Sequence, residues 1–328
     1  MHVELLDLLR CPACHGELRA RADALLCPAC DRAYELVHGV PDFRDHPPDR
    51  PRHGEVCRKV MDLWPTRSYR ELWSLLHPDR PDELDRLWLE HEERAPARGE
   101  RRYEAIARTA RALGVALRPR GVALDVGCGM GSAVFALARR ARLAVGLDIL
   151  LTDLLLARKR FAEAGLDNVA FVCASATALP LREGAVDLAN ATDVIEHLPD
   201  PRAFLAEAQR ALRPGGALFL NSPNRFTVLT REPHVRLWGV GWLPRRWMEP
   251  YVRWRRGRAY RGKRLLSVFE LRRLLRQTFG GSWAIRAFVP RAGLGGLLRR
   301  VLGAVAKPVL PQHHVLAWKP PPPDEWEA

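Results

Sequence analysis

The stretch "VALDVGCGMGSAVFALARR", Val122 to Arg140, decides the fold. Its apolar first residues indicate a buried strand, its three closely spaced glycines a tight turn, and its run of alanine and leucine a helix. A strand, a glycine-rich turn and a helix in this order present free backbone N–H groups to a bound nucleotide or nucleoside. The stretch therefore predicts the first strand–helix unit of a doubly wound α/β sheet, with a ligand at the turn.

The residues around the turn indicate which class of ligand it binds. Dinucleotide sites have the spacing G-x-G-x-x-G/A, whereas Gly127, Gly129 and Gly131 follow G-x-G-x-G and Ser132 stands where a third glycine or alanine is expected. Asp125 lies two residues before the first glycine. A carboxylate at this position repels a pyrophosphate but attracts a ligand that carries an ammonium and a sulfonium.

A second acidic residue supports the same ligand. Asp148, in "AVGLDIL", lies 21 residues after Gly127 and at the end of the next expected strand. An acidic side chain at that place accepts hydrogen bonds from ribose hydroxyls. A nucleoside with a ribose, a cationic amino-acid tail and no phosphate is S-adenosylmethionine, which is the cofactor that the sequence predicts.

Two motifs, "LDVGCGMG" at 124–131 and "VIEHLPDP" at 194–201, resemble those of class I S-adenosylmethionine-dependent methyltransferases of type 11. The resemblance implies methyl transfer on a Rossmann-like, doubly wound sheet of seven strands. It also implies that the glycines lie against the methionine part of the cofactor, that Asp125 supports its amino group and that Asp148 holds the ribose. Ile149 would pack on the adenine, and Ser175 stands where this family usually has an aspartate. The candidate cofactor-binding residues are Asp125, Gly127, Gly129, Gly131, Asp148, Ile149, Ser175, Ala176 and Asn190.

Four cysteines precede this domain as two C-P-A-C pairs, Cys11, Cys14, Cys27 and Cys30. Paired C-x-x-C knuckles supply the four thiolates that a structural Zn²⁺ prefers. Two disulfides or a redox pair are the alternatives, and the absence of an expected βαβ pattern around the cysteines argues against the redox pair. The flanking residues, including a "Y-x-L…G-V-P" ending, resemble the Trm112-like zinc ribbon, a module that is a partner or fused part of methyltransferases.

The chain divides into five segments by composition and pattern. We expect a Trm112-like zinc ribbon, a linker with a helical cap, the cofactor-binding core, a basic Trp/Arg-rich insert that covers the substrate, and a closing hairpin with a helical insert at 293–307 and a Pro-rich tail. Their expected bounds are 1–44, 45–118, 119–222, 223–282 and 283–328.

Catalysis needs a positioned acceptor, because the sulfonium is already an activated methyl donor. A hydroxyl or amine acceptor also gains from a general base, and His197 follows the fourth expected strand at the carboxyl edge, where an acceptor should lie. His197 and its neighbour Glu196 are the catalytic candidates. Asp193, Glu196 and His197 would also share one helical turn, but we favour local hydrogen bonds over a metal site, since three ligand types on one turn do not establish one.

The insert carries most of the excess positive charge. The chain has a net charge of +14, and residues 231–307 hold 19 of its 52 basic residues but three of its 38 acidic ones. Tryptophans alternate with arginines at 232–266, which suits RNA, an anionic membrane surface, or a folded cap with buried tryptophans over a small acceptor. We favour the cap.

These observations predict a methyltransferase that acts on a hydroxyl, amine or carbon of a small-molecule or lipid-like acceptor. The alternatives are an RNA methyltransferase that uses the insert and the ribbon and, less favoured, a non-catalytic binding module. No run of about 18 uncharged apolar residues occurs, and the N-terminus lacks the pattern of a signal peptide. We therefore expect a cytoplasmic protein, with peripheral membrane contact as the alternative.

Overall fold

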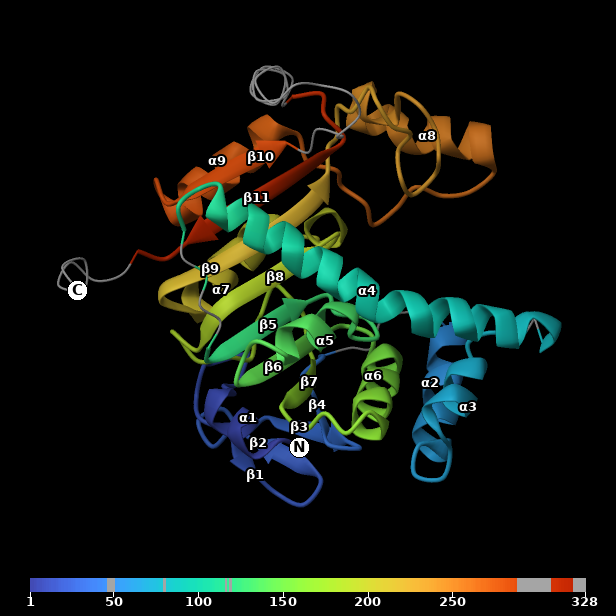
Figure 1. The fold of residues 1–328 in the computed structure, drawn as a ribbon, viewed down its shortest axis with the longest axis vertical. Coiled ribbons are helices and arrows are strands. Elements are labelled where there is room, and N and C mark those ends of the chain that lie inside the picture. The colour runs from blue at the N-terminus through green and yellow to red at the C-terminus, as the bar shows by residue number, and fades with distance from the viewer. Residues whose placement is uncertain (46–50, 79–80, 116, 118–119, 288–307, 321–328) are drawn as a thin grey trace.

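The computed structural model describes all residues except 46–50, 79–80, 116, 118–119, 288–307 and 321–328, which are drawn in grey in Figure 1. Among the described residues, 11 strands form one sheet in the order β1-β2-β3-β4-β7-β6-β5-β8-β9-β11-β10. The last seven strands of that order are the predicted Rossmann-like sheet. Their bounds are β5 Val122–Val126, β6 Leu143–Asp148, β7 Val169–Cys173, β8 Val186–Thr192, β9 Leu212–Pro223, β10 Trp283–Ala287 and β11 Gln312–Trp318.

The direction of these strands explains the positions of the binding residues. Neighbouring strands from β7 to β9 are parallel, whereas β11 is antiparallel to both β9 and β10. The two strands at the C-terminal end of the sheet thus pair antiparallel with each other, and the helical insert expected between them at 293–307 lies outside the described residues. Parallel strands end at one edge, so the loops that follow β5, β6 and β8 meet there.

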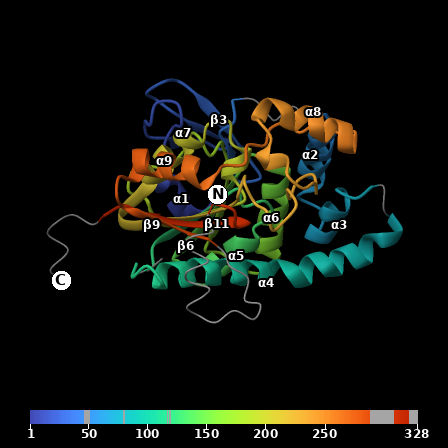
Figure 2. The ribbon, with the colours of Figure 1, turned by 90° about the horizontal axis from the view of Figure 1, so that it is seen from above.

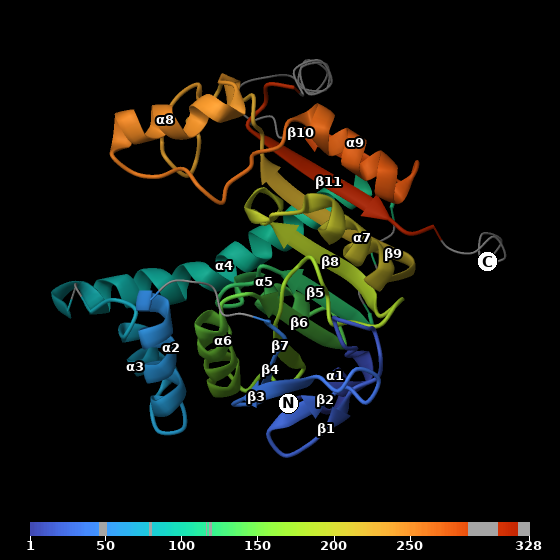
Figure 3. The ribbon, with the colours of Figure 1, turned by 180° about the vertical axis from the view of Figure 1, so that it is seen from behind.

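Helices cover both faces of the sheet (Figures 2 and 3). Side chains alternate along a strand, so Ala123 of β5 packs with one set of helices while Leu124 packs with the other. The first set is α4 Leu84–Arg111, α5 Ser132–Ala138 and α6 Leu151–Glu163. The second set is α1 Val3–Leu8, α7 Pro201–Ala211 and α9 Val268–Phe279. Burial on both faces explains why the central strands read as continuous apolar runs.

The N-terminal cysteine-rich module extends the sheet at β7, at the lower end of Figure 1. Its strands are β1 Arg19–Ala20, β2 Ala24–Leu26, β3 Ala33–Val37 and β4 Val40–Asp42. β4 runs parallel to β7, with Asp42 opposite Cys173, and the Phe43 N–H donates to the Cys173 carbonyl at 2.8 Å. The Arg10 N–H donates to the Pro180 carbonyl at 3.0 Å. The module is thus hydrogen-bonded into the core sheet.

The segment between the module and the core forms the expected helices. They are α2 Pro51–Leu63, α3 Tyr69–Ser74, the short η1 Pro81–Glu83 and the long α4. Tyr69 and Trp73 of α3 pack against Leu156 of α6, and the Tyr69 hydroxyl lies 3.9 Å from Met130 Sδ in the glycine-rich turn. Gly99 of α4 lies so close to α5 that a Cβ there would overlap the Ser132 carbonyl oxygen. The cap helices therefore lie over the glycine-rich turn.

The basic insert has a small core of its own, at the end of the sheet away from the cysteine-rich module (Figure 1). It contains the short η3 Val240–Trp242 and its main helix, α8 Arg245–Arg256. The short η2 Ile195–His197 belongs to the core and lies beneath the insert. The residues that form this small core are Val235, Leu237, Val240, Met248, Val252 and Tyr260. Helix α9 instead packs on α7 and the core sheet, so the separate part of the insert ends before residue 268.

The tryptophans of the insert are not its core, and the prediction that they are buried in a folded cap was wrong. Trp238, Trp242, Trp247 and Trp254 are 52%, 52%, 56% and 76% exposed. The interior of the insert is filled by Tyr260, Met248 and smaller aliphatic side chains instead, and the tryptophans lie on the outer side of α8 and its neighbouring turns. Among the described residues, no helix is long and apolar enough to span a bilayer.

Candidate cofactor and acceptor site

The glycine-rich turn is held by hydrogen bonds from its backbone N–H groups to residues of β6. The Gly127 N–H donates to the Leu147 carbonyl at 2.7 Å, and the Gly129 N–H donates to Asp148 Oδ2 at 2.8 Å. Gly127 has φ +68°, and a Cβ there would lie 2.5 Å from Val194 Cγ2. The turn therefore needs glycine both for its left-handed backbone and for its close approach to the segment after β8.

Asp125 is a buried carboxylate with one oxygen unpaired. Its side chain is 2% exposed, and Oδ1 accepts a hydrogen bond of 2.6 Å from Asn190 Nδ2 on β8. Asp125 Oδ2 has no hydrogen-bond partner among the described residues. Burial raises the pKa of Asp125 to about 6, although the hydrogen bond from Asn190 and, to a smaller extent, the charge of Arg102 on α4 oppose the shift. Because buried polar atoms are nearly always satisfied, this oxygen fits the ammonium group of a bound cofactor.

Asp148 lies across the turn from Asp125 and organises the adjoining loop. Its Oδ1 accepts from the Leu150 N–H at 3.0 Å, and its own carbonyl accepts from the Ala174 N–H at 3.0 Å. Ile149 is 39% exposed, as expected for a residue that packs on a ligand. Ser175 Oγ lies 2.8 Å from Thr177 Oγ1. The structure thus brings the candidate ribose and adenine residues together at the ends of β6 and β7.

The residues expected near the acceptor follow β8 on η2, the short helix of residues 195–197. Glu196 is 1% exposed, and its Oε2 accepts from Ser222 Oγ at 3.2 Å. Burial raises the pKa of Glu196 to about 7 and lowers the pKa of His197. His197 Nε2 lies 3.3 Å from His234 Nε2. Asp193, by contrast, is exposed and lies outside the group formed by Glu196, His197 and His234.

The sequence did not point to His234 or to its partner Glu232 as residues of the site. Glu232 Oε1 lies 2.6 Å from His234 Nδ1 and accepts from the Tyr260 hydroxyl at 3.1 Å. His234 lies 37 residues after His197 in an insert without a recognisable motif, so no local spacing pointed to the contact. The available signal was weak: His234 is the single histidine of residues 223–282 and stands two residues after Glu232, one of three acidic residues in that range.

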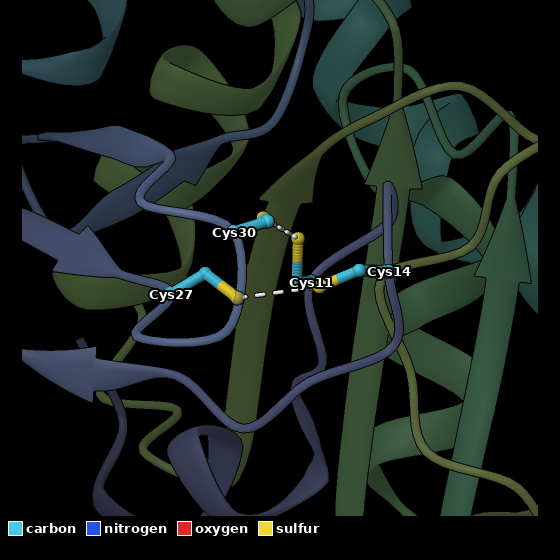
Figure 4. Close-up of side chains that lie close together, drawn as sticks. All are labelled: Cys11, Cys14, Cys27 and Cys30. Carbon is cyan, nitrogen blue, oxygen red and sulfur yellow. Dashed lines mark hydrogen bonds between the residues drawn. The ribbon is translucent and has the colours of Figure 1, made fainter.

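The four cysteine sulfurs of the N-terminal module lie together (Figure 4). Cys11 Sγ is 3.6 Å from Cys30 Sγ and Cys14 Sγ is 3.4 Å from Cys27 Sγ, and all four atoms lie within 4.8 Å of one another. Tetrahedral zinc with bonds of about 2.3 Å places sulfurs about 3.8 Å apart. The seven cysteines are all free thiols, so the geometry fits structural zinc and not the disulfide alternative.

Comparisons with known families agree with both parts of this architecture. Residues 124–220 match the family model described as a methyltransferase domain, and residues 2–39 match the one described as Trm112p-like protein. The chain thus carries a class I S-adenosylmethionine-dependent methyltransferase domain with an N-terminal Trm112-like region. The predicted class, fold and cofactor are confirmed.

Curated relatives are similar over somewhat more than a third of this chain. Ubiquinone biosynthesis O-methyltransferase of Idiomarina loihiensis is 31% identical over 128 residues, which is 37% of this chain and 51% of that protein. The protein of the same name from Parvibaculum lavamentivorans is 34% identical over 128 residues, 37% of this chain and 48% of its own length. The chain spans about half the length of the curated relatives it matches.

Solved structures are similar at a lower sequence identity than the curated relatives. Phosphoethanolamine N-methyltransferase 2 of Haemonchus contortus has a TM-score of 0.46 at 17% identity, over 66% of this chain and 53% of its own. A chain in a complex of the Haloferax volcanii Trm112 methyltransferase activator has a TM-score of 0.43 at 16% identity, over 78% of this chain and 99% of its own.

We expect S-adenosylmethionine to bind more weakly as the pH falls through about 6. The cofactor's ammonium stays protonated below its pKa of about 8, while Asp125, with a pKa of about 6, takes up a proton and loses its attraction for it. Between pH 7 and pH 5 the dissociation constant should rise about tenfold. Calorimetry across this range measures it. Asp125→Asn should flatten the profile, whereas Asp153→Asn, at the nearby carboxylate, should retain it.

Proposed function

We propose that this protein transfers the methyl group of S-adenosylmethionine to a hydroxyl of a small-molecule or lipid-like acceptor. One observation carries the proposal: the buried carboxylate of Asp125, with one unpaired oxygen, faces the same edge of the sheet as Asp148 and the glycine-rich turn. A carboxylate placed to bind an ammonium (Asp125) and a second placed to bind a ribose (Asp148) suit S-adenosylmethionine, which carries both groups and no phosphate. The relatives named as O-methyltransferases support a hydroxyl as the acceptor.

In this proposal the cofactor is held by Asp125, Asp148 and the turn between them. When bound, the sulfonium supplies an electrophilic methyl group. Asp125 Oδ2 accepts from the cofactor's ammonium, and Asp148 accepts from the ribose while it also holds the Gly129 N–H. Ile149 lies where it can cover one face of the adenine. Fixing donor and acceptor in line supplies much of the rate enhancement.

The acceptor hydroxyl would lie at the cluster formed by Glu196, His197 and His234. The depressed pKa of His197, caused first by burial and then by His234, leaves its imidazole neutral at pH 7 and able to accept a proton. The insert that carries His234 lies over η2, where the Arg264 N–H donates to the Glu196 carbonyl at 2.6 Å. The insert is therefore placed to cover the acceptor and exclude water.

RNA as the acceptor is not favoured, since the reported relatives carry the names of small-molecule enzymes. The membrane alternative has no support from the comparisons either.

The test follows label from S-adenosylmethionine into extract of a strain that lacks the protein. After incubation with purified protein, we expect the label in the small-molecule or lipid fraction, and far less label with Asp148→Asn. Label in the RNA fraction would contradict the proposed acceptor class. Absence of label in every fraction, together with absence of cofactor binding, would contradict enzymatic activity.

A further inference from the structure

We propose that Arg258 and Lys263 form a subsite for a phosphate group of the acceptor, at the rim of the site that contains His197 and His234. Both cationic residues belong to the basic insert, which lies beyond the carboxyl end of β9 (Figure 1). The inference rests on the proposed function, because it names the class of molecule whose hydroxyl receives the methyl group. That class is a phosphate monoester.

The acidic side chains of the insert are already paired with basic ones. Residues 223–282 contain three acidic residues, and each lies 2.6–2.8 Å from a basic side chain. The pairs are Glu232 with His234, Glu270 with Arg245, and Glu249 with both Arg253 and Arg261. The other basic residues of this range form no ion pair with a carboxylate in the described part of the chain. An uncompensated positive charge therefore remains on the insert.

Arg258 is anchored at the histidine that faces η2. Its Nη2 donates to the His234 carbonyl at 2.7 Å, and the side chain is otherwise exposed. The described residues provide no second hydrogen bond and no ion pair for this guanidinium. Its remaining N–H donors are therefore available to a ligand, and the planar fork of a guanidinium matches the oxygens of a phosphate.

Lys263 lies over the other histidine of the pair. The backbone N–H of its neighbour Arg264 donates to the Glu196 carbonyl at 2.6 Å, which holds this part of the insert on η2. Burial, His234 and the charge of Lys263 together lower the pKa of His197, so the ammonium lies near that imidazole. Lys263 is half-buried, and its ammonium has no hydrogen bond or ion pair among the described residues. A bound anion would satisfy it.

The number of charges favours a phosphate over a carboxylate. A phosphate monoester carries close to two negative charges at pH 7, which the two cations balance, whereas a carboxylate would leave one of them uncompensated. The acidic side chains nearby oppose an anion only weakly. Glu232 is paired with His234, and burial raises the pKa of Glu196 to about 7.

The subsite holds a part of the acceptor that does not react. Binding energy from a remote, non-reacting group places the hydroxyl of the same molecule in line with the methyl donor. The phosphate can belong to a water-soluble metabolite or to a lipid, since both carry the same group.

Calorimetric titration of the full-length protein with phenyl phosphate, at neutral pH and constant ionic strength, tests the subsite. We expect saturable binding to the wild type and at least tenfold weaker binding of benzoate, the matched carboxylate. Arg258→Gln and Lys263→Met should each weaken the binding of phenyl phosphate about tenfold, because each removes a charged hydrogen-bond donor. Arg253→Gln, which removes the same charge from an arginine paired with Glu249, should bind like the wild type.

Affinity for S-adenosylmethionine shows whether each variant remains folded, since Asp125 and Asp148 are untouched. Arg258→Gln also removes the bond to the His234 carbonyl, so Lys263→Met is the variant that leaves the fastening of the insert intact. Wild-type affinity for phenyl phosphate in both folded variants, or an equal loss in Arg253→Gln, overturns the subsite. Benzoate binding as tight as that of phenyl phosphate overturns the assignment to phosphate.

The methyl-labelled product identifies the source of the phosphate. Alkaline phosphatase should convert it to a labelled compound that no longer binds an anion-exchange resin, and a product that phosphatase leaves unchanged contradicts the inference. Label in the aqueous phase before this treatment assigns the phosphate to a soluble metabolite, and label in the organic phase assigns it to a lipid. Binding of phenyl phosphate requires no methyl transfer, so failure of the proposed function is separately visible.

Discussion

Asp148→Asn is expected to weaken S-adenosylmethionine binding about 100-fold. Hydrogen bonds to a charged acceptor contribute about 1.5–3 kcal/mol each, and 1.4 kcal/mol corresponds to a tenfold change in affinity. The amide retains one acceptor oxygen for the Gly129 N–H but presents an NH₂ group to the Leu150 N–H or to a ribose hydroxyl. Calorimetric titration with S-adenosylmethionine measures the loss.

Asp187 offers the matched control for Asp148. Its carboxylate also caps strand ends, accepting from the Val122 N–H and from Arg213 Nε at 2.7 Å each, but at the opposite edge of the sheet. Asp187→Asn should cost stability and leave the cofactor's dissociation constant unchanged. Unchanged binding by a folded Asp148→Asn variant would show that Asp148 does not hold the ribose.

Cys27→Ser is expected to release zinc, to unfold the N-terminal module and to lower the melting temperature by about 10 °C or more. A module this small lacks a sufficient core, and zinc supplies its folding free energy. Several kcal/mol lost from a chain of this size shift the melting temperature by about 2–4 °C for each kcal/mol. Differential scanning fluorimetry measures the shift, and a chromogenic chelator measures the released zinc.

Unfolding of the N-terminal module should also weaken cofactor binding. Arg44, which follows β4, is ion-paired to Asp42 and donates from Nη1 to the Ile149 carbonyl at 3.2 Å. We therefore expect a severalfold weaker cofactor affinity in Cys27→Ser and faster hydrogen exchange at Phe43, whose N–H bonds to β7. Cys57→Ser, at a cysteine outside the cluster, is the control. Retained protection at Phe43 without zinc would contradict the prediction.

The residues that sequence reasoning found are those whose chemistry is local. The spacing of Gly127 and Gly129, the acidic residue before them and the paired cysteines each form a pattern within about twenty residues, and the physical reason for the pattern does not depend on distant contacts. The seven-stranded, doubly wound core sheet followed from the resemblance, and the structure agrees with it.

The features that the sequence did not predict depend on contacts between segments far apart in the chain. His234 meets His197 because the insert folds back over η2, and β4 pairs with β7 because the module docks there. Neither contact has a signature in local periodicity. The exposure of Trp254 shows the same limit: the composition of the insert was read correctly, but which side of α8 faces inward is set by its packing on Val235 and Tyr260.

The pairing of β4 with β7 also has a consequence for how the protein is assembled. An N-terminal partner on the same chain is present in a fixed one-to-one ratio and at an effective concentration of the order of millimolar. The ribosome completes the zinc-binding module about 125 residues before β7, a lead of about 6–25 seconds at ordinary translation rates. The exposed edge of β7 therefore emerges with its complement already made. Because β4 and β7 belong to one chain, dilution cannot separate the module from the core sheet.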